Sequence, residues 1–151
     1  MRYLIGLGNY TAFDDSIGVR VIEHVAAHDL EHGFRAIDLG ANPLNLVAYL
    51  DPGTTAILMI DAARMGLAPG EFRCFRPQEV ESDKALGGLT THESDVLRVV
   101  ELARQVGQYL PPLLFFGIEP ALVQNGVGLS EVLATRLTTY AREAIMRLLR
   151  L

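Results

Sequence analysis

Three side chains that can transfer protons or bind a metal stand at the predicted ends of strands or starts of helices: Asp15, Asp61 and His92. Asp15 follows the first apolar run, Asp61 directly follows the apolar run 56–60, and His92 opens a later predicted helix. In an open parallel sheet, functional groups gather in the loops beyond the carboxyl ends of the strands. Two carboxylates and one imidazole with an open coordination position suit a borderline divalent metal such as nickel or zinc. The spacing alone leaves open whether the three side chains converge.

Each of these residues also has a simpler interpretation. An isolated aspartate at position 15 is typical of a helix cap. His92, in the first turn of a helix capped by Thr90, is typical of a surface histidine, although the positive helix end also keeps the ring neutral and able to bind a metal. Asp61 is harder to explain in this way, because desolvation penalises an unpaired charge next to a buried sheet. We therefore expect a cation, a set of hydrogen-bond donors or a metal beside Asp61.

Histidines at every fourth position form a second pattern, comprising His24, His28 and His32. Residues four apart share one face of a helix. The core-facing stripe of that helix is expected to run through Val19, Ile22, Ala26 and Leu30. The histidines fall nearly opposite this stripe, and we interpret them as a solvent-facing row that can hold adventitious metal.

The glycines of the first loop and the single cysteine are weaker candidates. The run Gly6-Leu7-Gly8 begins like a dinucleotide-binding loop, but Thr11 stands where the third glycine is needed, so we expect a tight turn instead. Cys74 lies in an alternating, strand-like stretch and is interpreted as a small buried hydrophobic residue. Because no G-x-S-x-G elbow occurs either, serine and cysteine nucleophiles are both disfavoured.

Apolar runs of strand length alternate with amphipathic patterns along the chain. Strands are predicted at Tyr3–Leu7, Phe34–Leu39, Ala56–Ile60, Glu71–Phe75 and Pro112–Gly117, the fourth as an exposed edge strand. Helices are predicted from Ser16 to about His32 with Gly33 as the stop, at Pro43–Leu50, from a capping box at Thr90 and Glu93 to about Tyr109, and at Ser130–Leu151. This alternation indicates an α/β fold: a single three-layer α/β/α domain over residues 1–151 with a mostly parallel twisted sheet of about five strands.

The composition of the chain disfavours several classes of function. A chain of 151 residues fits one domain, and its net charge of −5 gives no electrostatic support for a nucleic-acid or anionic-membrane partner. The single cysteine excludes an intrachain disulfide and a cysteine-rich metal site. Since the sequence shows neither a signal-peptide pattern nor an apolar run long enough to span a membrane, we expect a cytoplasmic protein.

Several of the segments named above belong to an ordered set that covers most of the chain: Gly6-Leu7-Gly8-Asn9, Asp14-Asp15-Ser16-Ile17-Gly18-Val19-Arg20, Ile60-Asp61-Ala62, Thr91-His92 and Gly117-Ile118-Glu119-Pro120. In order and spacing, this set resembles the hydrogenase maturation endopeptidases, the proteases that process the large subunit of nickel-iron hydrogenases. The resemblance implies an endopeptidase that removes the C-terminal extension of a nickel-loaded large-subunit precursor. It also implies a twisted sheet between helical layers, in agreement with the predicted elements.

The resemblance further implies roles for individual residues. Asp15, Asp61 and His92 match the positions that bind nickel in the family, and the nickel is supplied by the precursor; zinc or cadmium could take its place in a crystal. We hypothesise that the metal polarises a peptide carbonyl or a water and that Asp15 or Asp61 is the catalytic base. The expected partner is the precursor alone, with no nucleic acid and no membrane, and the protein is expected to be a monomer.

Two alternatives come from other functional classes. A signalling receiver domain also has an acidic pair after its first strand and an aspartate after its third, but it needs a lysine at the end of its last strand, and the only lysine here is Lys84. A chaperone that binds the immature large subunit without cutting it is the second alternative. A pepsin-type pair of aspartates is disfavoured, because Asp15-Ser16-Ile17 lacks the glycine that such enzymes use.

Overall fold

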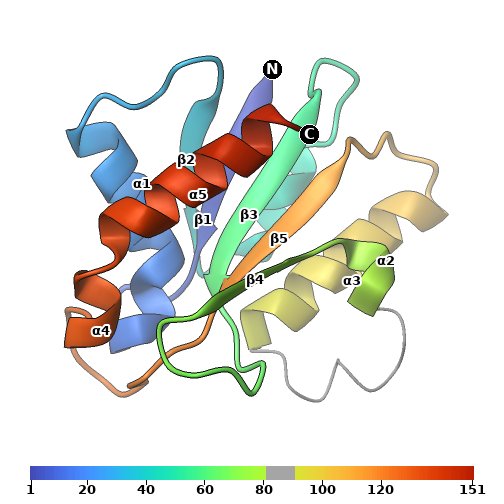
Figure 1. Cartoon of the computed structure of the whole chain (residues 1–151). Helices are drawn as coiled ribbons and strands as arrows, with labels where there is room; N and C mark the ends of the chain where they lie inside the picture. The colour runs from blue at the N-terminus through green and yellow to red at the C-terminus, as the bar shows by residue number, and fades with distance from the viewer. Residues whose placement is uncertain (81–90) are drawn as a thin grey trace.

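One mixed sheet forms the centre of the protein. The computed structural model describes residues 1–80 and 91–151, except for the side chains of Val80 and of residues 91–94. The strands are β1 (Arg2–Leu7), β2 (Arg35–Gly40), β3 (Ala56–Ala62), β4 (Phe72–Phe75) and β5 (Leu113–Ile118), in the order β2-β1-β3-β5-β4 (Figure 1). All neighbours pair in parallel except β4, which runs antiparallel to β5 at the edge. The predicted five-stranded, mostly parallel sheet is confirmed, as is the edge position of its fourth strand.

Helices cover both faces of this sheet (Figure 1). One face carries α1 (Ile17–Ala27), the short α4 (Glu131–Ala134) and α5 (Leu137–Leu149). The other carries the 3₁₀ helix η2 (Pro43–Tyr49) and α3 (Thr91–Gln105). The remaining helical turns are η1 (Phe13–Ser16), which leads into α1, and α2 (Pro77–Val80). The arrangement is the predicted three-layer α/β/α fold. Within residues 1–80 and 91–151, none of the helices combines the length and apolar character needed to span a membrane.

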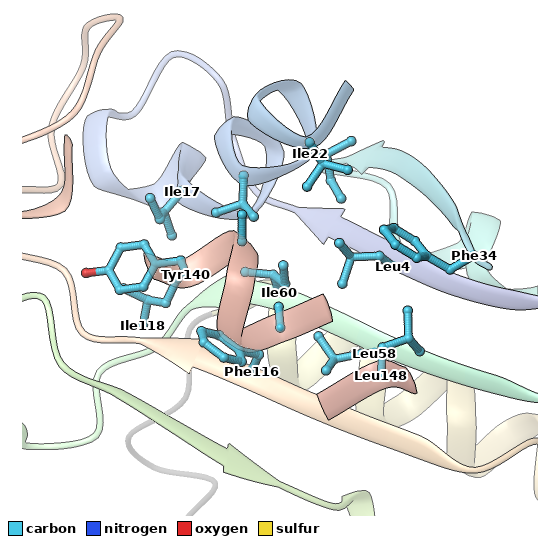
Figure 2. Packing of buried hydrophobic residues seen from close by; sticks show 14 of the residues in the cluster. Leu4, Ile17, Ile22, Phe34, Leu58, Ile60, Phe116, Ile118, Tyr140 and Leu148 are labelled. Atoms are coloured by element: carbon cyan, nitrogen blue, oxygen red, sulfur yellow. The ribbon is translucent and has the colours of Figure 1, made fainter. Parts of the chain in front are cut away.

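The central strands are apolar throughout because both of their faces are covered. Successive side chains of a strand point to opposite faces, so β3 sends Leu58 and Ile60 to one side and Ile57 and Met59 to the other. The first side meets α1 and α5 in a cluster that includes Leu4, Ile17, Ile22, Phe116, Tyr140 and Leu148 (Figure 2). The second meets η2 and α3 in a cluster that includes Leu46, Val96 and Val100.

The first helix ends earlier than the sequence indicates. It stops at Ala27, because Asp29 adopts a left-handed conformation (φ 51°) and the chain closes with bonds from Leu30 N–H to Val25 O and from Asp29 N–H to Ala26 O. This is a Schellman motif with aspartate in the place usually taken by glycine. The predicted stop at Gly33 is therefore wrong by one turn or more.

This early end also changes the predicted faces of α1. Ala26 is exposed and Leu30 lies beyond the helix, whereas Val21 and Val25 are buried, so the predicted core stripe is only partly correct. His32 lies outside the helix as well. The three-histidine row is thus reduced to His24 and His28, whose rings stack with centroids 4.1 Å apart.

Three other boundaries differ from the prediction. The segment 43–49 forms a 3₁₀ helix. The third helix ends at Gln105, where Gly107 takes a positive φ of 76° and closes a second Schellman motif. The predicted terminal helix is divided into α4 and α5, with Thr135 as the C-cap of α4 and Arg136 as the N-cap of α5; the Thr135 hydroxyl donates to Val132 O (3.2 Å) at the end of α4. The capping residue predicted at Thr90 lies outside the described residues, as does Lys84.

Candidate active site

Asp61 is part of the central strand and does not follow it. The strand β3 continues through Asp61 and Ala62, which pair with Gly117 and Ile118 of β5, so the predicted strand end at Ile60 is wrong by two residues. The Asp61 side chain is only 1% exposed, and its Oδ1 accepts the Ala62 N–H at 2.8 Å. Asp61 is therefore buried at the carboxyl end of the strand, whereas the cation, donor set or metal expected beside it stays a prediction.

Asp15 lies in the helical turn η1, just before α1. Its side chain is 8% exposed, and Oδ2 accepts the Asn9 N–H at 3.2 Å. The N-cap residue of α1 is Ser16, whose hydroxyl donates to Phe13 O (2.6 Å). The interpretation of Asp15 as a helix cap is therefore wrong: its carboxylate turns back towards the loop that follows β1.

Glycines allow the Asp15 segment to lie directly on the sheet. A Cβ atom at Gly18 would be 2.2 Å from Ile60 O and 2.3 Å from Leu7 O, so the start of α1 touches the carboxyl ends of β3 and β1. A Cβ at Gly8, where φ is 141°, would be 2.0 Å from Asp15 O. Gly18 thus allows the close packing of helix on strand for which a dinucleotide-binding loop would use a glycine at the position of Thr11. Since η1 also contacts β3, Asp15 in this turn and Asp61 at the end of β3 lie at the same edge of the sheet.

His92 is the second residue of α3, in the first helical turn as predicted. The far end of this helix lies at the amino edge of the sheet, because Tyr109 donates to Thr54 O (3.2 Å) just before β3 begins. The first turn of α3 is consequently directed towards the carboxyl edge, where Asp15 and Asp61 lie. The His92 side chain is outside the description, and the side chains that are described include no group of three or more metal-binding residues. The three-residue ligand set stays a prediction.

Asp14 has a structural importance that sequence reasoning missed. Its side chain is fully buried and accepts four hydrogen bonds, from Ala121 N–H (2.9 Å), Leu122 N–H (2.9 Å), Ser130 N–H (2.7 Å) and the Ser130 hydroxyl (2.7 Å). No local pattern could have revealed this role, since its partners lie 107 to 116 residues later in the chain.

Glu119 holds the other loop of this edge. It is 7% exposed, and its Oε1 accepts the N–H groups of Met65 (2.7 Å) and Leu67 (2.9 Å), in the loop that follows Asp61. The space at Gly117 is tight, because a Cβ there would lie 3.0 Å from the Ala63 Cβ and 3.1 Å from the Met65 sulfur. The motif 117–120 therefore shapes the loop behind β3.

Cys74 lies on the edge strand β4, and the paired histidines lie at the C-terminal end of α1. Cys74 is half-buried on β4, and burial raises the pKa of its thiol to about 11, as expected for a packing residue that is protonated at neutral pH. His28 Nδ1 lies 2.8 Å from His24 O at the end of α1. Burial, followed by the neighbouring His28, lowers the pKa of His24 below its usual value.

Comparison with known proteins identifies the family of the chain and agrees with its fold. A model of the hydrogenase maturation protease family matches residues 19–147. The hydrogenase 3 maturation protease of Escherichia coli K12 is 31% identical over 121 residues, which cover 80% of this chain and 73% of that protein. The hydrogenase expression/formation protein HoxM of Azotobacter vinelandii is 28% identical over 144 residues, which cover 94% of this chain and 69% of that protein. The chain spans 58% of the related protein HupM of Azotobacter chroococcum.

Solved structures give the same result for the fold. The hydrogenase maturating endopeptidase HybD from E. coli matches with a TM-score of 0.81 at 20% identity, over 99% of this chain and 92% of that one. A crystal structure of the hydrogenase 3 maturation protease matches with a TM-score of 0.75 at 27% identity, over 95% of this chain and 88% of that one. With a mostly parallel sheet of the same fold and a family match over most of its length, the chain belongs to the hydrogenase maturation protease family.

Proposed function

We propose that this protein is an endopeptidase that removes the C-terminal extension of a nickel-loaded nickel-iron hydrogenase large-subunit precursor. The observation that carries the proposal is the pair of buried carboxylates, Asp15 and Asp61, at one edge of the sheet in a chain of this family. Nickel is treated as part of the substrate, installed in the precursor before cleavage. The protein would act in the cytoplasm as a monomer.

The proposed chemistry is hydrolysis of one peptide bond. Asp15, Asp61 and His92 are proposed to bind the client's nickel, a borderline metal that accepts both carboxylate and imidazole ligands. The metal would supply polarisation of a carbonyl or of a water. One of the two aspartates takes a proton from the attacking water, and the proton then passes to the leaving amine, so that the products are a carboxylate and a new amino terminus.

Exposed apolar side chains around this edge support a protein substrate. Tyr10 is 40% exposed on the loop after β1, and Leu122, Val123 and Val127 are exposed on the loop after β5. The two loops are joined by a bridge between Ala12 and Gly126. Exposed apolar side chains on two joined loops are compatible with contact with another protein.

The test is to incubate the purified protein with a nickel-loaded precursor and, separately, with the same precursor free of nickel. Mass spectrometry of the client reports its C-terminus. We expect loss of a single C-terminal peptide from the nickel-loaded client only. If the client stays intact but co-purifies with the protein, the chaperone alternative is supported; if it neither binds nor is cut, the proposed client is wrong.

A further inference from the structure

Asp14 carries a carboxylate that is fully buried in the turn η1. A fully buried carboxylate is costly unless donors surround it, and the four donors of Asp14 all come from the segment 121–130. Oδ2 accepts three of these bonds and Oδ1 accepts the fourth, so both oxygens are used. A single side chain thereby fastens the loop after β5 to the turn η1.

Backbone bonds extend this fastening on both sides of Asp14. Its own N–H donates to Leu122 O (3.0 Å), the Phe13 N–H donates to Gly126 O (3.1 Å), and the Gly126 N–H donates to Thr11 O (2.8 Å). Phe13 has a positive φ of 48°, a conformation that is unfavourable for a bulky residue. Its ring packs on Gly126, where a Cβ atom would lie 2.4 Å from the ring. The loop therefore holds Phe13 in a conformation that it would not adopt alone.

These contacts also determine the position of Asp15, which follows Asp14 in the chain. The direction of its side chain depends on the backbone angles of Phe13 and Asp14, and its Oδ2 reaches the Asn9 N–H (3.2 Å) only while that turn is kept. We propose that Asp14 is a positioning residue whose carboxylate locks the segment 121–130 onto η1 and so holds Asp15 at the end of β3. This inference rests on the proposed function, because Asp15 is the residue that would act on the client.

Glu119 offers a matched comparison on the same edge. Both of its loop donors bond to one oxygen, Oε1, so the carbonyl oxygen of a glutamine can accept them equally well. Asparagine at position 14 cannot do the same, because its NH₂ group would replace an oxygen that accepts from N–H or O–H donors. The same carboxylate-to-amide change should therefore be tolerated at Glu119 and harmful at Asp14.

The experiment compares Asp14→Asn, Glu119→Gln and the unchanged chain. Thermal unfolding gives a temperature at which all three are fully folded, and kcat for the nickel-loaded client and amide hydrogen exchange are then measured there. We expect Asp14→Asn to lower kcat about 10- to 100-fold, since displacement of a reactive group by about 1 Å is enough for such a loss. The amides of Ala121, Leu122 and Asn9 should exchange about tenfold faster. Glu119→Gln should stay within about twofold of the unchanged chain in kcat.

Two results would overturn the positioning role: an unchanged kcat in folded Asp14→Asn, or unchanged protection of the Asn9 amide, which reports the bond to Asp15. A merely structural role would lower the unfolding temperature and leave kcat intact. If Asp14→Asn does not fold, Ser130→Ala removes only the hydroxyl donor and must show a smaller loss of the same kind. If the unchanged chain does not cut the client, the proposed function fails, and the Asn9 amide alone decides the positioning role.

Discussion

Replacing Gly18 by alanine would place a methyl group against three backbone atoms. The new Cβ would lie 2.2 Å from Ile60 O, 2.3 Å from Leu7 O and 2.8 Å from Leu7 N. These atoms belong to the carboxyl ends of β3 and β1 and cannot rotate away as a side chain can. The start of α1 must therefore retreat by about 1 Å to restore ordinary contact distances of about 3.4 Å.

Two free-energy terms of opposite sign then compete. Alanine in a helix is more favourable than glycine by about 1 kcal/mol. Overpacking against fixed neighbours costs about 1–3 kcal/mol and occasionally more, and contacts this short with backbone place Gly18→Ala at the upper end. We therefore expect net destabilisation of about 2 kcal/mol, which lowers the unfolding temperature by roughly 4–8 °C for a domain of this size.

The assay is thermal unfolding of Gly18→Ala beside Gly53→Ala. Gly53 is an exposed turn glycine whose nearest contact, Asp51 Oδ1 at 2.9 Å, belongs to a side chain that can move, so its change should stay within about 0.5 kcal/mol. Client cleavage by Gly18→Ala should also fall, because Asp15 moves with the start of the helix. An unfolding temperature equal to or above that of the unchanged chain would refute the reasoning, since helix propensity alone predicts that result.

Two further predictions concern residues outside the carboxyl edge. With its pKa raised from 9.0 to about 11, Cys74 should react with iodoacetamide at pH 8 roughly 100-fold more slowly than a free thiol, with a rate that rises with pH towards 11; reaction at the rate of a free thiol would contradict the described burial. Because the lowered pKa keeps His24 neutral at pH 7, the stacked pair His24 and His28 should account for weak retention on immobilised nickel. Replacing both histidines by alanine should abolish that retention and leave client cleavage unchanged, whereas loss of cleavage would assign the pair to the site.

The strands were predictable because burial dictates their composition. Residues 56–60 are apolar without interruption, as a strand covered on both faces must be, and the alternation in 71–75 marked β4 as an edge. The end of β3 was misjudged for the same reason: Asp61 looks like the polar residue that closes a strand. Its pairing with Gly117 is a tertiary fact that no pattern within β3 reveals.

The ends of the helices and the hydrogen bonds of Asp14 and Asp15 could not be predicted from the sequence. Asp29 ends α1 in a conformation that sequence reasoning assigns to glycine, and Gly33 drew the predicted boundary too far along the chain. Asp14 and Asp15 are neighbours of the same type, yet one is bonded to the distant segment 121–130 and the other to Asn9. Long-range pairing of this kind leaves no local signature, so the sequence predicted the residue types and their edge of the sheet but not these hydrogen-bond partners.

The most direct test of the proposed site is single-turnover cleavage of the nickel-loaded precursor by Asp61→Asn, with Asp51→Asn as the control. Asparagine keeps an oxygen for the Ala62 N–H and preserves the shape of residue 61, so the variant should fold. Asp51 is an exposed carboxylate that accepts the Gly53 N–H in the turn before β3, at the opposite edge of the sheet. We predict loss of cleavage by at least about 100-fold in Asp61→Asn and an unchanged rate in Asp51→Asn. Folded Asp61→Asn that removes the C-terminal peptide at the original rate would contradict the assignment of this edge as the active site.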